Sequence, residues 1–220
     1  MTGSSRADGT PSAPLLLWGW GGHGRVVHEI AHAAGRIVIG VVDADPGKLD
    51  GSFAVEWLES EFLEAWEEHG VAMLEGAELV LAFGEVDLRM TRIEAFEDVL
   101  ARALVHPSAL VSPSARLGRG VTVHQRAVIN TAAQVGVGSI INTGAIVEHD
   151  CVLGPGVHLA PGSVLTGGVR AEAGAWIGAG ATVVGGCRIG PRSTIGAGAV
   201  VLKDVDARAK VAGVPARRIG

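Results

Sequence analysis

The chain has 220 residues, of which 48% are hydrophobic and 4% aromatic, and its formal net charge is −5. This length can bury a core in one or two domains, and the charge provides no basic surface for nucleic acid or anionic lipid. Two cysteines do not make a disulfide framework, and no apolar run approaches the roughly 18 residues of a membrane span. We therefore expect a cytoplasmic protein with no membrane span and no nucleic-acid partner, in which residues 1–14 form a small, polar, disordered leader.

Residues 15–102 alternate between short apolar strands and helical patterns. Strands are predicted over residues 15–18, 36–42 and 78–83, and amphipathic helices over residues 25–34, 59–69 and 87–101. This alternation is typical of a parallel sheet with crossover helices. Three strands make only half of a dinucleotide-binding fold, so we predict a small α/β, half-Rossmann-like βαβαβ domain.

A glycine-rich turn follows the first strand. Gly19, Gly21 and Gly24 match the pattern G-x-G-x-x-G, and Asp43 follows at about the twenty-residue distance of the acid that binds ribose. Backbone N–H groups at the start of a helix bind phosphate. Because the domain is too short for a full dinucleotide fold, the turn argues against a dehydrogenase and favours a sugar linked to a mononucleotide.

From Val105 the pattern changes to a six-residue repeat. Every sixth residue up to Val201 is Val, Ile or Leu, except Ala171, and the residue four positions later is Ala, Ser, Cys or Val. Such self-similarity indicates stacked coils, in which three hexads close one triangular turn and residues eighteen apart lie above one another. We predict an all-β parallel β-helix over residues 103–206, followed by a C-terminal segment over residues 207–220.

The segment Asn142 to Cys151, with the sequence NTGAIVEHDC, carries a closer resemblance. Together with the turn Gly21-Gly22-His23-Gly24 and the hexad repeat, it resembles the hexapeptide-repeat acyltransferase superfamily, in particular the sialic-acid O-acetyltransferase-like branch. That branch includes acetyltransferases acting on the 4-amino group of nucleotide-linked amino sugars. The resemblance implies a left-handed β-helix, a homotrimer with active sites between subunits, and acetyl-CoA as co-substrate.

The resemblance also assigns roles to residues. It implies that His149 is the general base and Asp150 its supporting carboxylate. It implies that the nucleotide-linked sugar is bound by Gly21, Gly22, His23, Asp43, Ala44 and Glu85. It implies that acetyl-CoA is bound by Asn142, His158, Gly167, Ala179 and Ala197. Ala44 and Glu85 depart from the family pattern, in which an acid and Asn are frequent, and the basic pair Arg217-Arg218 falls near the expected adenine end of the coenzyme.

The chemistry of acetyl transfer fits this assignment. An amine or hydroxyl that attacks a thioester must lose a proton, and an imidazole titrating near neutrality is suited to accept it. We therefore predict an acetyl-CoA-dependent N-acetyltransferase of a nucleotide-linked amino sugar. O-acetylation of a sialic acid or another sugar hydroxyl, and a non-catalytic trimeric binding module, remain alternatives.

Two further patterns are interpreted as structural. Cys151 and Cys187 fall on inward positions of their hexads, where we expect packing rather than nucleophilic attack. His106, His124 and Asn142 are spaced one coil apart and should form a polar ladder. Two stacked histidines supply too few ligands for a closed zinc site, so no metal is predicted.

Overall fold

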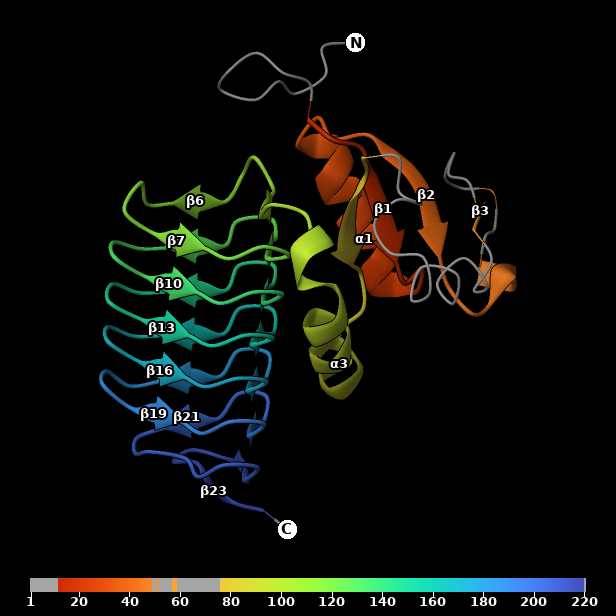
Figure 1. The fold of residues 1–220 in the computed structure, drawn as a ribbon. Helices are drawn as coiled ribbons and strands as arrows, with labels where there is room; N and C mark the ends of the chain where they lie inside the picture. The colour runs from red at the N-terminus through yellow and green to blue at the C-terminus, as the bar shows by residue number, and fades with distance from the viewer. Residues whose placement is uncertain (1–11, 49–50, 52–56, 59–75, 220) are drawn as a thin grey trace.

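The structure, a computed structural model, describes residues 12–48, 51, 57–58 and 76–219. A small α/β domain lies beside the upper coils of a long β-helix, and the C-terminus lies at the opposite end of that helix (Figure 1). The predicted fold class, an α/β domain followed by a left-handed parallel β-helix, is confirmed. No helix in these residue ranges has the length and hydropathy required to cross a bilayer.

The N-terminal domain is built on a parallel sheet with the strand order β3-β2-β1-β4. Its elements are β1 (Leu15–Trp18), α1 (Gly22–Ala33), β2 (Val38–Val42), the 3-10 turn η1 (Pro46–Lys48), β3 (Trp57–Leu58), β4 (Glu78–Leu81), α3 (Val86–Phe96) and the 3-10 turn η3 (Glu97–Val99). The prediction of three strands was wrong, because β3 adds a fourth at the edge of β2. The predicted helix over residues 59–69 lies outside the described residues.

Two helix boundaries differ from the prediction for local reasons. α1 begins at Gly22 rather than at residue 25, because the last glycines of the turn already adopt helical geometry. α3, which corresponds to the helix predicted over residues 87–101, ends at Phe96 and is followed by η3 over Glu97–Val99, so it stops short of residue 101. Glu85 caps the start of α3, where its carboxylate accepts hydrogen bonds from the N–H groups of Asp87 and Leu88.

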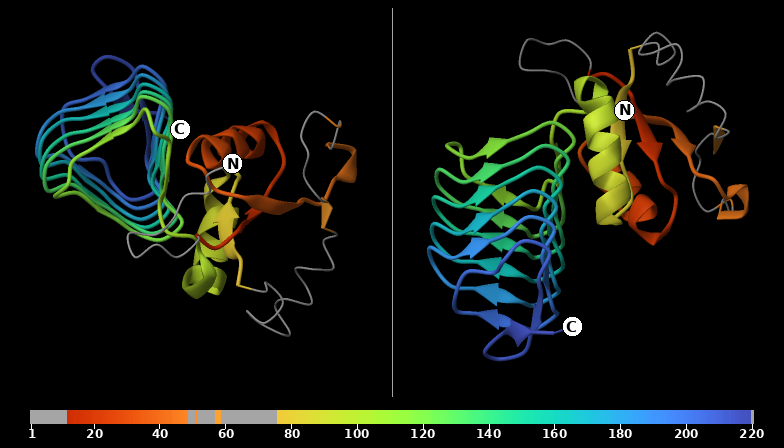
Figure 2. Two further views of the ribbon diagram at one scale, coloured as in Figure 1. Left: turned by 90° about the horizontal axis from the view of Figure 1, so that it is seen from above. Right: turned by 60° about the horizontal axis from the view of Figure 1, so that its bottom comes forward.

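The β-helix has a triangular cross-section made of three sheets (Figure 2). The eight-stranded sheet contains β5 (Leu104–Val105), β8 (Thr122–Val123), β11 (Ile140–Ile141), β14 (His158–Leu159), β17 (Trp176–Ile177), β20 (Thr194–Ile195), β22 (Lys210–Ala212) and β23 (Arg217–Arg218). The six-stranded sheet contains β6 (Leu110–Val111), β9 (Val128–Ile129), β12 (Ile146–Val147), β15 (Val164–Leu165), β18 (Thr182–Val183) and β21 (Val200–Val201). The five-stranded sheet contains β7 (Arg116–Leu117), β10 (Gln134–Val135), β13 (Val152–Leu153), β16 (Arg170–Ala171) and β19 (Arg188–Ile189).

The hexad pattern explains the coil residue by residue. In each of these strands up to β21, the second residue is the repeated aliphatic position, and most of these side chains are fully buried in one continuous core. Each turn places one residue in the left-handed region, and this occurs at every sixth position from Gly120 to Gly198. Glycine adopts that conformation without steric cost, which accounts for the glycine content of this half. Asp150 occupies one of these positions with φ of 60°.

The repeat ends in a shortened coil. Strand partners are eighteen residues apart throughout the upper stack, as in Trp176 and Thr194, but Thr194 pairs with Lys210, which is only sixteen residues away. The stack therefore continues through β22, and β23 returns antiparallel along it. Residues beyond 206 thus add a further layer to the prism.

The three faces of the prism have different outward residues. α1 and α3 cover the upper part of the eight-stranded sheet. Ile93 of α3 packs on Gly138 and Met90 packs on Gly156, and a Cβ atom added to either glycine would lie 2.3 Å from the packed side chain. The outward positions of the six-stranded sheet are Leu110, Val128, Ile146, Val164, Thr182 and Val200. The outward positions of the five-stranded sheet are Arg116, Gln134, Val152, Arg170 and Arg188. One face is therefore covered, one is aliphatic and one is largely polar.

Candidate active site

His149 and Asp150 form an exposed pair on the edge between the six-stranded and five-stranded sheets. His149 Nδ1 lies 2.9 Å from Asp150 Oδ2, and the side chains are 61% and 68% exposed. A carboxylate accepts only, so Nδ1 carries the proton and Nε2 has a free lone pair. The left-handed backbone of Asp150 turns its side chain back toward the imidazole. The pair has the form of a general base with an orienting carboxylate.

Glycine leaves a trough beneath this imidazole. Gly167 lies one coil below His149, and a Cβ atom there would come within 2.5 Å of Cε1 and 2.6 Å of Nε2. Gly185 follows one coil further along the same edge. The ring of His149 therefore lies in the space that a side chain at position 167 would fill, so glycine is required beneath it.

Cys151 follows this pair but faces the core. Its side chain is buried, and Sγ donates to the carbonyl oxygen of Thr166 at 3.3 Å. Burial raises the pKa of the Cys151 thiol, which disfavours the thiolate required for nucleophilic attack.

The glycine turn of the N-terminal domain forms an open helix start. Nothing lies within 4 Å of the Cβ positions of Gly21, the N-cap of α1, or of Gly22, its first residue. Gly24 is instead packed, because a Cβ atom there would lie 2.2 Å from the carbonyl oxygen of Gly19. Open space therefore lies beside the start of α1, and the first N–H groups and positive dipole end of a helix suit a phosphate.

Asp43 is fixed beside this turn. Its Oδ2 accepts from Trp20 N–H at 2.7 Å, and its Oδ1 accepts from Lys48 Nζ at 2.6 Å. Burial alone would raise the pKa of Asp43, but the bonds from Lys48 and Trp20 lower it on balance. Ala44 next to it is exposed, and Lys48 is a charged neighbour that the sequence pattern did not single out. Glu85 is exposed, and its carboxylate accepts hydrogen bonds from two N–H groups at the start of α3.

Three histidines gather where the N-terminal domain meets the eight-stranded sheet. The rings of His23 and His124 stack at 5.2 Å, and His158 lies 6.3 Å from His23. Asn142 Oδ1 accepts a hydrogen bond from Thr143 N–H, so Asn142 Nδ2 is the group that points toward His158 Nε2, at 3.4 Å. Because Nδ2 donates, His158 Nε2 is the acceptor, and the proton of the neutral His158 imidazole lies on its Nδ1. Of the predicted polar ladder, His124 is thus a buried interdomain residue, whereas His106 bonds to Ser108 at 2.8 Å.

Burial and a neighbouring cation keep these imidazoles neutral. Burial, with smaller contributions from charged neighbours, lowers the pKa of His23 and of His124 to about 3, and that of His158 to about 4. Among those neighbours, Arg89 of α3 is common to all three and is itself fully buried, donating from Nη1 to the carbonyl oxygen of Gly138 at 3.0 Å. Within the described ranges, its Nε and Nη2 have no hydrogen-bond partner. Arg89 carried no motif signal, and His124 was expected only as part of a polar ladder, because the burial of both residues depends on the docking of the two domains.

The predicted site residues therefore fall into three groups at different places around one chain. His149, Asp150 and Gly167 lie on the edge opposite the eight-stranded sheet, whereas His158 and the glycine turn lie on the covered face. Ala179 and Ala197 are exposed one coil apart on turns after β17 and β20, along a third line. A single chain does not bring these groups together.

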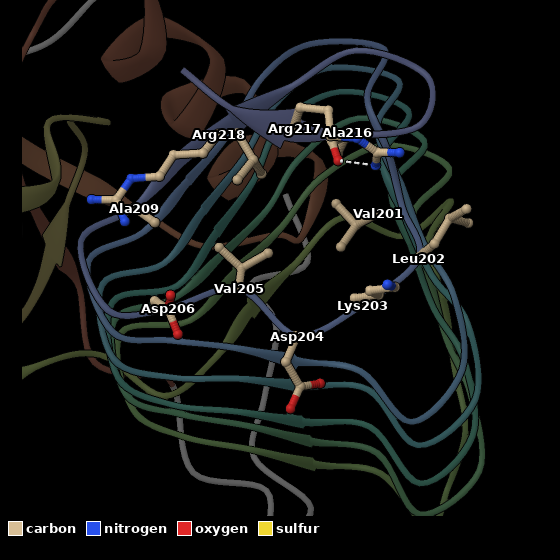
Figure 3. Close-up of a pocket in the computed structure, with 11 residues that line it drawn as sticks. Val201, Leu202, Lys203, Asp204, Val205, Asp206, Ala209, Ala216, Arg217 and Arg218 are labelled. Carbon is tan, nitrogen blue, oxygen red and sulfur yellow. Dashed lines mark hydrogen bonds between the residues drawn. The ribbon is translucent and has the colours of Figure 1, made fainter. Parts of the chain in front are cut away.

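The open lower end of the prism contains a hollow of about 420 Å³ (Figure 3). Its walls include Val201, Val205 and Val211 from the core, with acidic and basic side chains at the rim. Arg217 bonds to the carbonyl oxygen of Ala216 at 3.0 Å. On the His149 edge, Lys203 lies three coils below the imidazole, so this hollow is remote from the proposed base. No group of three or more His, Cys, Asp or Glu side chains suited to a metal ion occurs in the part of the chain that the structure describes.

A left-handed β-helix with an exposed imidazole–carboxylate pair above a glycine trough defines a hexapeptide-repeat acyltransferase. Two family models match the chain: PglD N-terminal domain over residues 14–96, and Bacterial transferase hexapeptide (six repeats) over residues 172–203. No curated protein matches it significantly.

Solved structures are similar over nearly the whole chain. A variant of perosamine N-acetyltransferase from Caulobacter crescentus, in complex with CoA and GDP-perosamine, is 38% identical with a TM-score of 0.83, over 94% of this chain and 97% of that one. The acetyltransferase domain of PglB from Neisseria gonorrhoeae, in complex with acetyl coenzyme A, is 32% identical with a TM-score of 0.84, over 94% and 100%. WeeI from Acinetobacter baumannii, at 22% identity and a TM-score of 0.77, shares the fold.

The chain belongs to the hexapeptide-repeat acyltransferases, in the sialic-acid O-acetyltransferase-like branch that includes the N-acetyltransferases of nucleotide-linked amino sugars. It is an acetyltransferase, and its co-substrate is acetyl-CoA.

Proposed function

We propose that this enzyme transfers the acetyl group of acetyl-CoA to the amino group of a nucleotide-linked amino sugar, with His149 as general base. The observation that carries the proposal is the exposed imidazole of His149, which packs on Gly167 while Asp150 Oδ2 lies 2.9 Å from its Nδ1. The complex of the Caulobacter relative with GDP-perosamine makes GDP-perosamine the first acceptor to test.

The transfer is a direct attack. The acceptor nitrogen forms a bond to the thioester carbonyl carbon as its proton moves to Nε2 of His149, and Asp150 stabilises the imidazolium. The C–S bond then breaks, and the proton passes from the imidazolium to the departing CoA sulfur. Burial of Cys151 supports a route without an acyl-enzyme.

The acceptor binds through the N-terminal domain. The open start of α1 at Gly21 and Gly22 receives the diphosphate, and Asp43 with Lys48 lies beside the nucleoside. His158 and Asn142 lie near the sugar and the thioester. Because acetyl-CoA is a cytoplasmic metabolite and both cysteines are free thiols, we place the enzyme in the cytoplasm.

The complete site requires a second copy of the chain, in a homotrimer. His149 lies on the edge opposite the acceptor domain, so the acceptor of one subunit meets the base of its neighbour. The aliphatic face of the six-stranded sheet, which borders the His149 edge, is the surface available for this contact. We expect Ile146→Glu to yield monomers without activity, and Val152→Glu on the polar five-stranded sheet to leave trimer and activity intact, as measured by light scattering and turnover. A trimeric, active Ile146→Glu variant would contradict this arrangement.

The chemical proposal is tested by the release of free CoA with purified enzyme. We expect turnover with GDP-perosamine or another 4-amino nucleotide sugar, and a fall of about 10²- to 10⁴-fold in kcat for His149→Ala with unchanged oligomeric state. Turnover confined to sugar hydroxyls would instead establish the O-acetyltransferase alternative.

A further inference from the structure

Arg89 is a cation buried between the two domains, and the described part of the chain gives it no counter-ion. Its side chain is fully buried, and its Nη1 donates to the carbonyl oxygen of Gly138 at 3.0 Å. Across the described ranges, its Nε and Nη2 have no hydrogen-bond partner, and no carboxylate lies within ion-pair distance of the guanidinium. Burial lowers the pKa of Arg89 to about 9, so it remains charged at neutral pH. Because an unpaired buried charge destabilises a fold, this residue calls for a functional explanation.

The described side chains around Arg89 supply little negative charge. Its Cζ lies over the ring of Phe83, 5.6 Å from the centroid, and the three interdomain imidazoles are neutral at neutral pH. The carboxylate of Glu85 favours the charged form of Arg89, but it is exposed and accepts hydrogen bonds from the start of α3. The described interface therefore carries a positive charge that an anion from outside the chain can compensate.

The charge of Arg89 reaches the start of α1. His124 is fully buried, its ring nitrogens lack a hydrogen-bond partner among the described residues, and its ring stacks on that of His23 at 5.2 Å. His23 is the second residue of α1 and follows Gly21 and Gly22, beside which open space lies. Burial lowers the pKa of His23 most, and His124 and Arg89 add to this effect. The helix dipole and the guanidinium therefore both make this open space electropositive.

We infer that Arg89 is a positioning residue whose charge couples the docking of the two domains to the binding of a diphosphate at the start of α1. In the free protein the unpaired cation opposes docking, and the bound anion supplies the missing counter-charge. Docking and binding then favour each other by the same factor. The inference rests on the proposed function, because it takes the diphosphate of the nucleotide-linked sugar as the anion.

The first test compares stability with affinity in Arg89→Met, which removes the charge but keeps an unbranched side chain. Without ligand this variant should melt at or above the native temperature, because an apolar side chain replaces an unpaired buried charge. It should nevertheless bind inorganic pyrophosphate, GDP and UDP about tenfold more weakly in calorimetry, since the attraction across a poorly polarisable interface is lost. Guanosine and uridine, which have no phosphate, should bind as they do to the native protein.

Two control variants separate charge from shape. Arg89→Lys keeps the charge and should bind pyrophosphate nearly as well as the native protein. Arg116→Met removes an exposed cation from the five-stranded sheet and should change neither the melting temperature nor the affinity.

Hydrogen exchange measures the coupling directly. Pyrophosphate should slow amide exchange in α3 and in β11, which lie on the two sides of the docked interface, in the native protein and in Arg89→Lys. The same ligand at saturation should slow exchange there much less in Arg89→Met.

Four results would overturn the inference: a lower melting temperature for Arg89→Met, native affinity of that variant for pyrophosphate, a loss that Arg89→Lys does not restore, or a native protein that binds none of the three phosphate ligands. All measurements are made without acetyl transfer. A protein that shows the expected pattern but acetylates no amino sugar would refute the proposed function and leave the coupling standing.

Discussion

Substitution of Gly167 by alanine tests the catalytic edge without touching a polar group. The added methyl would lie 2.5 Å from Cε1 and 2.6 Å from Nε2 of His149, whereas ordinary contacts are 3.4–4 Å. The imidazole must therefore retreat by about 1 Å, and a misplacement of that size costs about 10²-fold in rate. That loss corresponds to about 2.7 kcal/mol of transition-state stabilisation.

The fold should tolerate this change. The imidazole is 61% exposed and can swing toward solvent, so the melting temperature of Gly167→Ala should stay close to that of the native protein. Gly185→Ala is the matched control, because it adds the same methyl one coil lower, where the nearest atoms are backbone and Thr166 Oγ1 rather than the imidazole. It should retain nearly full kcat.

The assay is steady-state release of CoA, which separates kcat from the KM of each substrate. We expect Gly167→Ala to lose kcat at saturating concentrations of both substrates. A native kcat for Gly167→Ala, or an equal loss of kcat in Gly185→Ala, would show that the reaction does not depend on the position of His149 above Gly167.

Further predictions concern the carboxylate and the interdomain histidines. Asp150→Asn should keep the left-handed turn, which Asn tolerates, and lower kcat about 10- to 100-fold without unfolding the coil, as circular dichroism would verify. The three buried imidazoles have pKa values below their unfolded value of about 6.5, so the stability they provide is present above pH 6.5 and is lost as the pH falls toward 3–4. Between pH 6.5 and 5 the free energy of unfolding should fall by about 2 kcal/mol per imidazole in denaturant titrations, and His124→Leu should reduce that slope by about a third. Arg89→Met should move acid unfolding to lower pH, since the charge that helps depress these pKa values is gone, whereas Arg89→Lys should remain acid-sensitive; equal behaviour of the two would exclude a role for the charge.

The repeat half was predictable because its energetics are local and periodic. Each hexad places one aliphatic side chain inward and one left-handed residue at the turn, so the sequence specifies the strand positions from Val105 to Val201. The shortened coil lies beyond that series. After Gly198 the next left-handed residue is Arg208, whereas a continued six-residue repeat would place it at residue 204. Such a change of period is visible only in backbone geometry and strand pairing.

The sequence indicated the candidate site residues but not the contacts around them. A motif identifies His149 and Asp150, because the pair is adjacent in sequence and its turn is local. It gives no information on Arg89 or His124, whose burial results from the docking of α3 and α1 on the β-helix. The resemblance assigned Glu85 to the nucleotide-linked sugar, and the motif gave no sign that the same carboxylate is the N-cap of α3.

The spacing of two histidines places them on opposite sides of the prism. His149 and His158 are nine residues apart, which is half of an eighteen-residue coil, so the winding of the prism carries them to opposite sides. No change of side-chain rotamer brings their rings together across a core filled by residues such as Cys151, Leu153 and Val157, all buried. If both act on one substrate, the second imidazole must come from a neighbouring chain. A mixed oligomer of His149→Ala and His158→Ala subunits should then regain activity that neither variant has alone, and its failure to do so would mean that the two residues do not serve the same site.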